Sequence, residues 1–107
     1  MEKIKEWFDK NKTFGLKTPE GWYGRPYDNH HNLSGLFNSN NRIIIETDEL
    51  NLFVITQSSE LMISIEENDL VINNFKTLVW DLLTYIDLKS EIKIFKDGEL
   101  RFVSYNY

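Results

Sequence analysis

One short segment of this sequence gathers more chemically active side chains than any other. Residues Gly21–His31 combine aromatic, cationic, acidic, amide and imidazole groups. The side chains that we regard as candidates for binding in this segment are Trp22, Tyr23, Arg25, Tyr27, Asp28, Asn29 and His30. Trp, Tyr and Arg often dominate the binding energy of protein interfaces. The segment is therefore a candidate recognition surface.

The same segment also has an architectural interpretation. Its aromatic rings would close one end of a sheet, and Gly21 and Gly24 would permit backbone conformations that larger residues avoid. Pro26 would hold Arg25 extended and direct its guanidinium toward Asp28 or toward backbone carbonyls. From the sequence alone, both interpretations remain open.

The neighbouring imidazoles His30 and His31 raise the question of metal binding or acid–base catalysis. Adjacent residues of an extended chain point to opposite faces, so both imidazoles cannot readily hold one metal. Asp28 and His30 could share a face, but two ligands fall short of the usual three or four. The sequence has neither a nucleophile-elbow serine nor a phosphate-binding glycine loop. We therefore expect no catalytic residues, no metal and no cofactor, and a non-enzymatic protein is the favoured class.

Acidic side chains are concentrated in the middle of the chain. The 107 residues carry a formal net charge of −5. Residues 1–27 hold six basic and four acidic side chains, whereas residues 28–69 hold one basic and eight acidic side chains. Nucleic acid is disfavoured as a partner, because binding it requires several lysines or arginines on one face.

Two acidic pairs, Asp48–Glu49 and Glu66–Glu67, lie in or beside expected turns. One interpretation is that they are solvated turn residues with no further role. The other is that they form an acidic face that steers a basic protein partner toward the molecule. We regard all four carboxylates as candidate binding residues.

The absence of cysteine excludes a disulfide scaffold, a thiolate zinc site and a cysteine nucleophile. No apolar run reaches the roughly 18 residues of a membrane span, and the first residues lack the apolar core of a signal peptide. We expect one cytoplasmic domain over residues 1–107, without membrane contact. The sequence makes no prediction of the oligomeric state.

The candidate residues must be positioned by elements that the apolar pattern predicts. Ile4, Trp7 and Phe8 have the spacing of a short amphipathic helix over residues 2–11. Strands are expected over residues 33–37, 42–47, 52–56, 61–66 and 70–72, and those over 42–47 and 52–56 should pair as a hairpin.

The last third of the chain predicts a second helix and a hairpin. Apolar residues recur at helical spacing over about residues 74–87, which predicts a longer amphipathic helix; they are Phe75, Leu78, Val79, Leu82, Leu83 and Ile86. Asp97-Gly98, between two alternating runs, predicts a closing β-hairpin. The expected fold is therefore α+β, with both helices packed on a mainly antiparallel sheet of about five to seven strands.

The run Gly-Trp-Tyr-Gly-Arg-Pro-Tyr-Asp-Asn at residues 21–29 is followed by a β-rich middle and an expected helix start at Asn73-Asn74-Phe75. Together these features resemble a group of small bacterial cytosolic proteins without an assigned activity. This resemblance implies a single α+β domain and supplies no catalytic residues. In size and acidity the chain is also similar to the immunity proteins that accompany bacterial toxins.

We therefore expect a non-enzymatic, immunity-like interaction module that binds a basic, toxin-like protein through its acidic middle region. One alternative is a small-ligand or metal-binding protein, with or without enzymatic activity, that uses the Gly21–His31 segment. Another is a structural or accessory domain.

Overall fold

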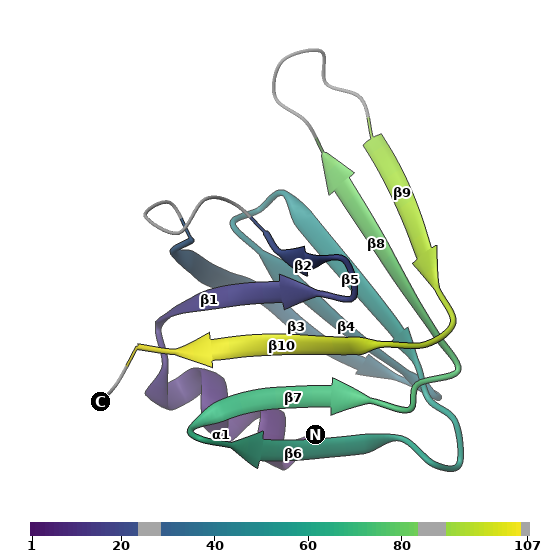
Figure 1. Cartoon of the computed structure of the whole chain (residues 1–107), viewed down its shortest axis with the longest axis horizontal. Helices are drawn as coiled ribbons and strands as arrows, with labels where there is room; N and C mark the ends of the chain where they lie inside the picture. Colours follow the sequence, from purple (N-terminus) through teal and green to yellow (C-terminus); the bar gives the residue numbers. More distant parts are fainter. Residues whose placement is uncertain (24–28, 84–89, 106–107) are drawn as a thin grey trace.

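Antiparallel strands make up most of this chain, and they form one sheet of ten strands in the part that the structure describes (Figure 1). The computed structural model describes residues 1–23, 29–83 and 90–105. In chain order the elements are α1 (Glu2–Lys10), β1 (Thr13–Thr18), β2 (Gly21–Trp22), β3 (His31–Ser39), β4 (Arg42–Thr47), β5 (Asn51–Thr56), β6 (Met62–Glu66), β7 (Asp69–Asn73), β8 (Thr77–Leu83), β9 (Ser90–Phe95) and β10 (Glu99–Ser104).

The sheet is folded so that its strands form two layers. The strand order is β6-β7-β10-β1-β3-β4-β5-β8-β9, with β2 added beside β1. Strands β6, β7, β10, β1 and β2 form the front layer, and strands β3, β4, β5, β8 and β9 form the back layer (Figure 1). Only the pairs Thr13–Asn32 and Phe14–His31 join β1 to β3. The sheet passes from one layer to the other at this short junction.

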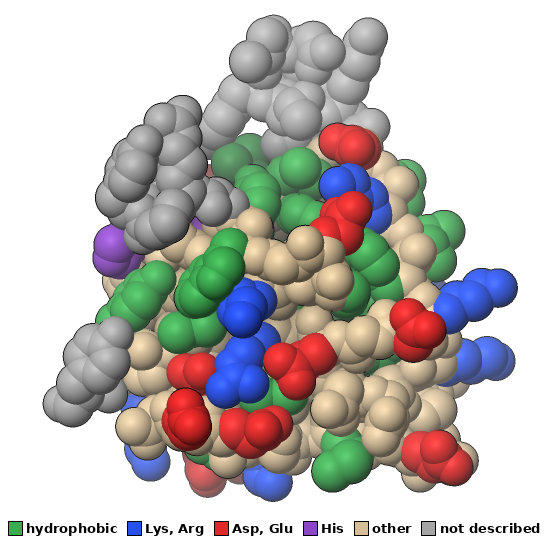
Figure 2. Space-filling view, viewed as in Figure 1, with side chains coloured by type: hydrophobic (Ala, Val, Ile, Leu, Met, Phe, Trp, Pro, Cys, Tyr) green, Lys and Arg blue, Asp and Glu red, His purple; other side chains and the backbone are tan. Residues whose placement is uncertain are grey.

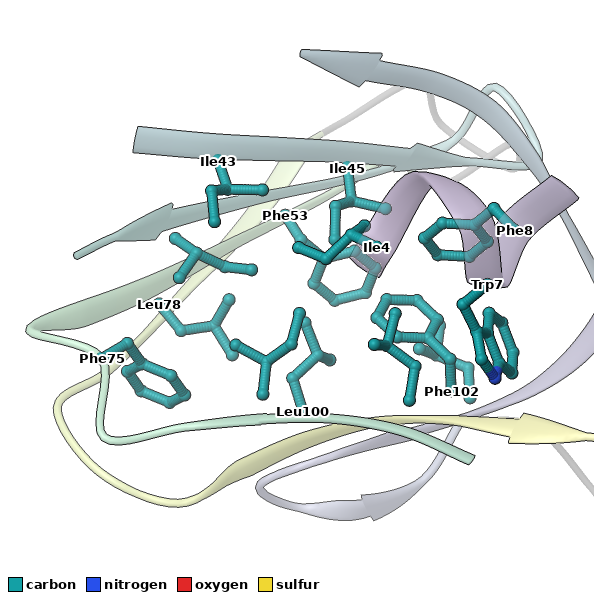
Figure 3. Packing of buried hydrophobic residues seen from close by; sticks show 14 of the residues in the cluster. Ile4, Trp7, Phe8, Ile43, Ile45, Phe53, Phe75, Leu78, Leu100 and Phe102 are labelled. Carbon is teal, nitrogen blue, oxygen red and sulfur yellow. The ribbon is translucent and has the colours of Figure 1, made fainter. Parts of the chain in front are cut away.

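Apolar side chains from both layers fill the space between them (Figure 3). Ile45 and Phe53 of the back layer and Leu100 and Phe102 of the front layer are fully buried in one cluster. The rings of Phe53 and Phe102 pack edge to face, with centroids 6.4 Å apart. Burying such a side chain is worth about 1.5–3 kcal/mol. Contact between the layers is therefore a main source of stability.

Helix α1 is held by this core. A helix of nine residues is marginal in water by itself, but Ile4, Trp7 and Phe8 are buried in the same cluster. The Trp7 indole Nε1 also donates a hydrogen bond of 2.8 Å to the backbone carbonyl of Asn68. These contacts join α1 to the turn between β6 and β7.

The expectation of an α+β fold with a longer helix over about residues 74–87 is wrong. Thr77–Leu83 form strand β8, which pairs with β5 on one side and with β9 on the other. Leu78 and Trp80 point into the core, and Val79 lies on the outer face. The helical spacing of apolar residues also suits a strand with two apolar faces, and residues 84–87 lie outside the described part. The fold is nearly all β, with one short helix among the described residues.

The expectation of a closing β-hairpin at Asp97-Gly98 is also wrong. Strand β9 pairs with β8, whereas β10 pairs with β1 and β7, so this segment connects the two layers. Gly98 has a φ of 107°, and a side chain there would meet Pro19. Gly98 therefore has the positive φ that an Asp-Gly turn predicts. The strands on either side of this turn, β9 and β10, nevertheless belong to different layers.

The expected number of about five to seven strands is also wrong, because the described residues form a sheet of ten. Several of the expected individual elements are confirmed. The N-terminal helix is α1, and the expected hairpin of residues 42–47 and 52–56 is β4–β5. The strands over residues 61–66 and 70–72 correspond to β6 and β7, which pair with each other. Among the described residues, no helix has the length and apolar character needed to cross a membrane.

Candidate functional site

The adjacent residues Trp22 and Tyr23 point to opposite sides of the front layer. Trp22 pairs with Lys17 of β1, and its side chain is 54% exposed on the outer face. The Lys17 ammonium lies 5.1 Å from the centre of the Trp22 ring, within the range of a cation–π contact. Tyr23 packs inward against His31 and Trp80. Tyr23 therefore has an architectural role, while Trp22 presents a ring to solvent.

His31 connects Tyr23 to the turn between β4 and β5. This side chain is buried, and its Nδ1 lies 2.6 Å from Asp48 Oδ2. Its Nε2 lies 3.3 Å from the carbonyl oxygen of Tyr23. The other carboxylate oxygen of Asp48 accepts a hydrogen bond of 2.9 Å from the backbone N–H of Asn32. Asp48 is thus fixed from two directions by the start of β3.

Both ring nitrogens of His31 make their contacts within the protein. Nδ1 faces a carboxylate oxygen of Asp48, and Nε2 faces the backbone carbonyl of Tyr23. The described residues contain no group of three His, Asp or Glu side chains that would hold a metal ion. The interaction of His31 with Asp48 therefore fixes the conformation of the β4–β5 turn.

The environment of Tyr23 alters its acidity. Burial raises the pKa of its hydroxyl above the ordinary value of 10.0, and the charge of Asp48 raises it further, although a hydrogen bond with Asn51 opposes the shift. Asn51 also accepts a hydrogen bond of 3.1 Å from the indole of Trp80. Tyr23 therefore stays neutral over the physiological pH range.

An open acidic hollow of about 440 Å³ lies beside the β4–β5 turn, lined by Asn32, Leu33, Ser34, Asp48 and Glu49. Asp48 and Glu49 both have left-handed backbone, with φ of 57° and 58°. The hydroxyl of Ser34 accepts a hydrogen bond of 2.9 Å from the backbone N–H of Glu49. The carboxylate of Glu49 is exposed. The turn therefore holds two acidic side chains at a hollow that is open to solvent.

The second acidic pair lies elsewhere. Glu66 and Glu67 are exposed at the β6–β7 turn of the front layer. Three strands, β10, β1 and β3, separate β7 from β4 in the sheet. The structure therefore does not bring the two acidic pairs together at one site.

The outer face of the front layer carries basic and acidic side chains close to one another (Figure 2). Arg101 Nε donates a hydrogen bond of 2.9 Å to Asp69, and Glu99 lies 3.5 Å from its Nη1. Burial opposes the charge of this guanidinium, but Asp69 and Glu99 outweigh that effect and raise the pKa of Arg101. Much of the charge on this face is therefore paired within the protein.

Two other candidates have contrasting surroundings. Asn29 is buried, its Oδ1 accepts a hydrogen bond of 2.9 Å from the backbone N–H of Leu16, and its carbonyl oxygen accepts one from the Tyr105 hydroxyl. His30 is exposed, and its ring lies 4.9 Å from that of Tyr105. Asn29 is therefore architectural. The candidates Arg25, Tyr27 and Asp28 lie outside the described residues.

The site includes residues that the sequence did not single out for binding. His31, Asn51 and Trp80 complete the surroundings of Tyr23, and Ser34 fixes Glu49. The Asn-Asn turn at residues 40–41 is a sequence signal that places the start of β3 opposite the end of β4, but the irregular register near Leu33 sets which residues face one another.

Comparison of this chain with protein-family models, curated proteins and solved structures finds no match. The function proposed for it therefore depends on the geometry of its own residues.

Proposed function

We propose that this chain is a non-enzymatic interaction module that binds a basic protein at the β4–β5 turn. The observation that carries the proposal is the position of Asp48 and Glu49, held by His31 and Ser34 at the rim of an open hollow. A turn fixed before binding loses less conformational entropy when a partner docks.

Electrostatics supports a cationic partner at this turn. Among the described residues, neither Asp48 nor Glu49 forms an ion pair with a lysine or arginine, and His31 is the ionisable partner of Asp48. A unit positive charge at about 4 Å from Glu49 gains roughly 1 kcal/mol in a water-like environment and about 4 kcal/mol at a partly desolvated surface. A lysine or arginine side chain in the hollow matches this charge.

The class of partner follows from the size and acidity of the chain. Residues 28–69 carry eight acidic side chains against one basic side chain, so an approaching basic protein is attracted before contact. A basic bacterial toxin is the partner that an immunity-like role implies. The network around Tyr23 and His31 then serves to fix the turn and has no part in chemistry.

The experiment is affinity capture with the tagged full chain from bacteria that encode it, followed by measurement of the dissociation constant of the purified partner at several salt concentrations. Glu49→Lys is the test variant, because the Glu49 side chain is exposed. Glu67→Lys is the matched control, because Glu67 is exposed in another turn with a similar φ of 52°.

We expect Glu49→Lys to weaken binding at least about tenfold and Glu67→Lys to change it less than about twofold. Added salt should weaken binding of the wild-type chain. The proposal fails if no basic protein is captured, if binding is insensitive to salt, or if the two variants behave alike.

A further inference from the structure

The outer face of the back layer carries a row of apolar side chains in register across five strands. Phe37 pairs with Ile44, Ile44 with Val54, Val54 with Val79, and Val79 with Ile94. The row therefore runs from β3 to β9. Because the alternate residues Ile43, Ile45 and Phe53 are buried in the core, the row lies on the side of the back layer that faces away from the front layer.

The row is open to solvent at both ends. Phe37 is 56% exposed and Ile94 is 64% exposed, while the three central side chains are half-buried by their neighbours. Leu52 and Ile92 lie in the next row of the same face, and Ile92 is 59% exposed. Scattered exposed apolar residues are ordinary, but a continuous apolar patch commonly marks an interaction surface.

Charged side chains flank the apolar row with opposite sign on its two sides. Arg42 lies on one side, in the row that continues through Thr56 and Thr77. Glu46 and Asp81 lie on the other side, in the row that includes Leu52. Arg42 and Glu46 belong to the same strand and lie on opposite sides of the apolar row. A two-fold axis parallel to this row therefore places Arg42 of one molecule opposite Glu46 of a second molecule.

We propose that a second copy of this chain binds this face and forms a two-fold symmetric dimer. With the axis along the apolar row, Phe37, Val54 and Ile94 of each copy meet the same row of the other. Arg42 of each copy then faces Glu46 of the other. The contact is isologous, so it closes after two copies and does not propagate.

The small size of the patch indicates a dimer of low affinity. Five strands spaced by about 4.8 Å and three rows of side chains cover roughly 20 by 20 Å, or about 400 Å² of flat sheet on each copy. Stable complexes bury about 800 Å² of accessible surface per partner, so this patch lies at the small end. The net charge of −5 also opposes association. The dimer therefore dissociates on dilution and is stabilised by salt, which screens this repulsion.

The experiment is sedimentation equilibrium of the full chain from about 1 µM to about 1 mM at low and high salt. Ile94→Glu is the test variant, since this side chain is mostly exposed and contributes little to folding. Met62→Glu is the matched control, because Met62 is 52% exposed on β6, the edge strand at the opposite end of the sheet. We expect Ile94→Glu to weaken dimerisation at least about tenfold and Met62→Glu to leave it unchanged.

A charge exchange tests the proposed axis. Arg42→Glu alone should weaken the dimer, and Arg42→Glu combined with Glu46→Arg should restore it, because the pair is recreated in reverse. A chain that remains monomeric up to about 1 mM overturns the proposal, as does a dimer that Ile94→Glu leaves intact or that the double exchange does not restore. Dimerisation should strengthen with salt whereas binding of a basic partner should weaken, so failure of one proposal is distinguishable from failure of the other.

Discussion

The ring of Tyr23 stacks on the imidazole of His31, with centroids 5.1 Å apart and ring planes inclined by 19°. This contact connects two segments that are separate in the sequence, Gly21–Tyr23 and the turn at Asp48 and Glu49. On one side, Tyr23 also meets Trp80 of the back layer edge to face. On the other, His31 reaches Asp48 in the β4–β5 turn. Tyr23 and the acidic turn are therefore connected through the side chain of His31.

Removing the Tyr23 ring should destabilise the protein. We expect Tyr23→Ala to lower the free energy of unfolding by about 2 kcal/mol, because a half-buried ring loses its contacts with His31 and Trp80. Tyr23→Phe keeps the ring and should lower it by less than about 1 kcal/mol. Urea denaturation of the three proteins measures both values. Equal losses in the two variants would show that the hydroxyl, and not the stacking, holds the segment.

Stability should decline at alkaline pH through ionisation of Tyr23. The folded protein raises the pKa of this hydroxyl above 10.0, so the unfolded chain loses the proton first as pH rises. The contribution is fully present below pH 10.0 and is lost as pH rises through the higher pKa of the folded state. The free energy of unfolding of wild type should therefore fall more steeply above this pH than that of Tyr23→Phe. Parallel profiles for the two proteins would contradict the assignment.

Asp48 should contribute to stability far more than its neighbour Glu49. We expect Asp48→Ala to lower the free energy of unfolding by about 2–3 kcal/mol, because it leaves the buried imidazole of His31 and the N–H of Asn32 without their acceptor. Glu49→Ala should change it by less than about 0.5 kcal/mol, since this side chain is exposed. Thermal and urea unfolding give both values. Similar small effects in the two variants would mean that the carboxylate of Asp48 does not hold the turn.

Gly15 should be intolerant of a side chain. An added Cβ would lie 2.6 Å from the Tyr105 hydroxyl oxygen and 3.1 Å from Cζ3 of Trp22. We expect Gly15→Ala to lower the free energy of unfolding by about 1–2 kcal/mol, because Tyr105 must move away from the carbonyl of Asn29. In a Tyr105→Ala background the same substitution should have a smaller effect. A double-mutant cycle with no coupling between the two positions would refute this explanation.

Local signals in the sequence predict local structure well. The β4–β5 hairpin follows from the apolar β-branched run of residues 42–47 and a polar turn, both of which act over a few residues. Strand β8 shows where such reasoning fails, because Leu78, Val79 and Leu82 fit a helical stripe as well as a strand. Pairing with β5 and β9 decides between them, and β5 ends 21 residues before β8 begins.

The same distinction applies to the candidate site. The sequence singles out Trp22, Tyr23, Asp48 and Glu49 by residue type, and the structure gives each a different role. It does not predict that His31 approaches Asp48, because this contact depends on the irregular register between β3 and β4 near Leu33. Nor does it predict that Glu66 and Glu67 lie three strands away from the other acidic pair, since that depends on the order of strands in the sheet.

The position of β10 has a consequence for how the protein is made. Residues 99–104 lie between β7 and β1 in the front layer, although they follow all the other described strands in the sequence. The meander β3–β4–β5 can pair while the chain is still emerging from the ribosome, because its strands are consecutive. The front layer can form only its β1–β2 and β6–β7 pairs, since β1 and β7 have no common neighbour until β10 arrives. A nascent chain stopped before residue 99 should therefore expose the apolar inner faces of both layers and depend on chaperones.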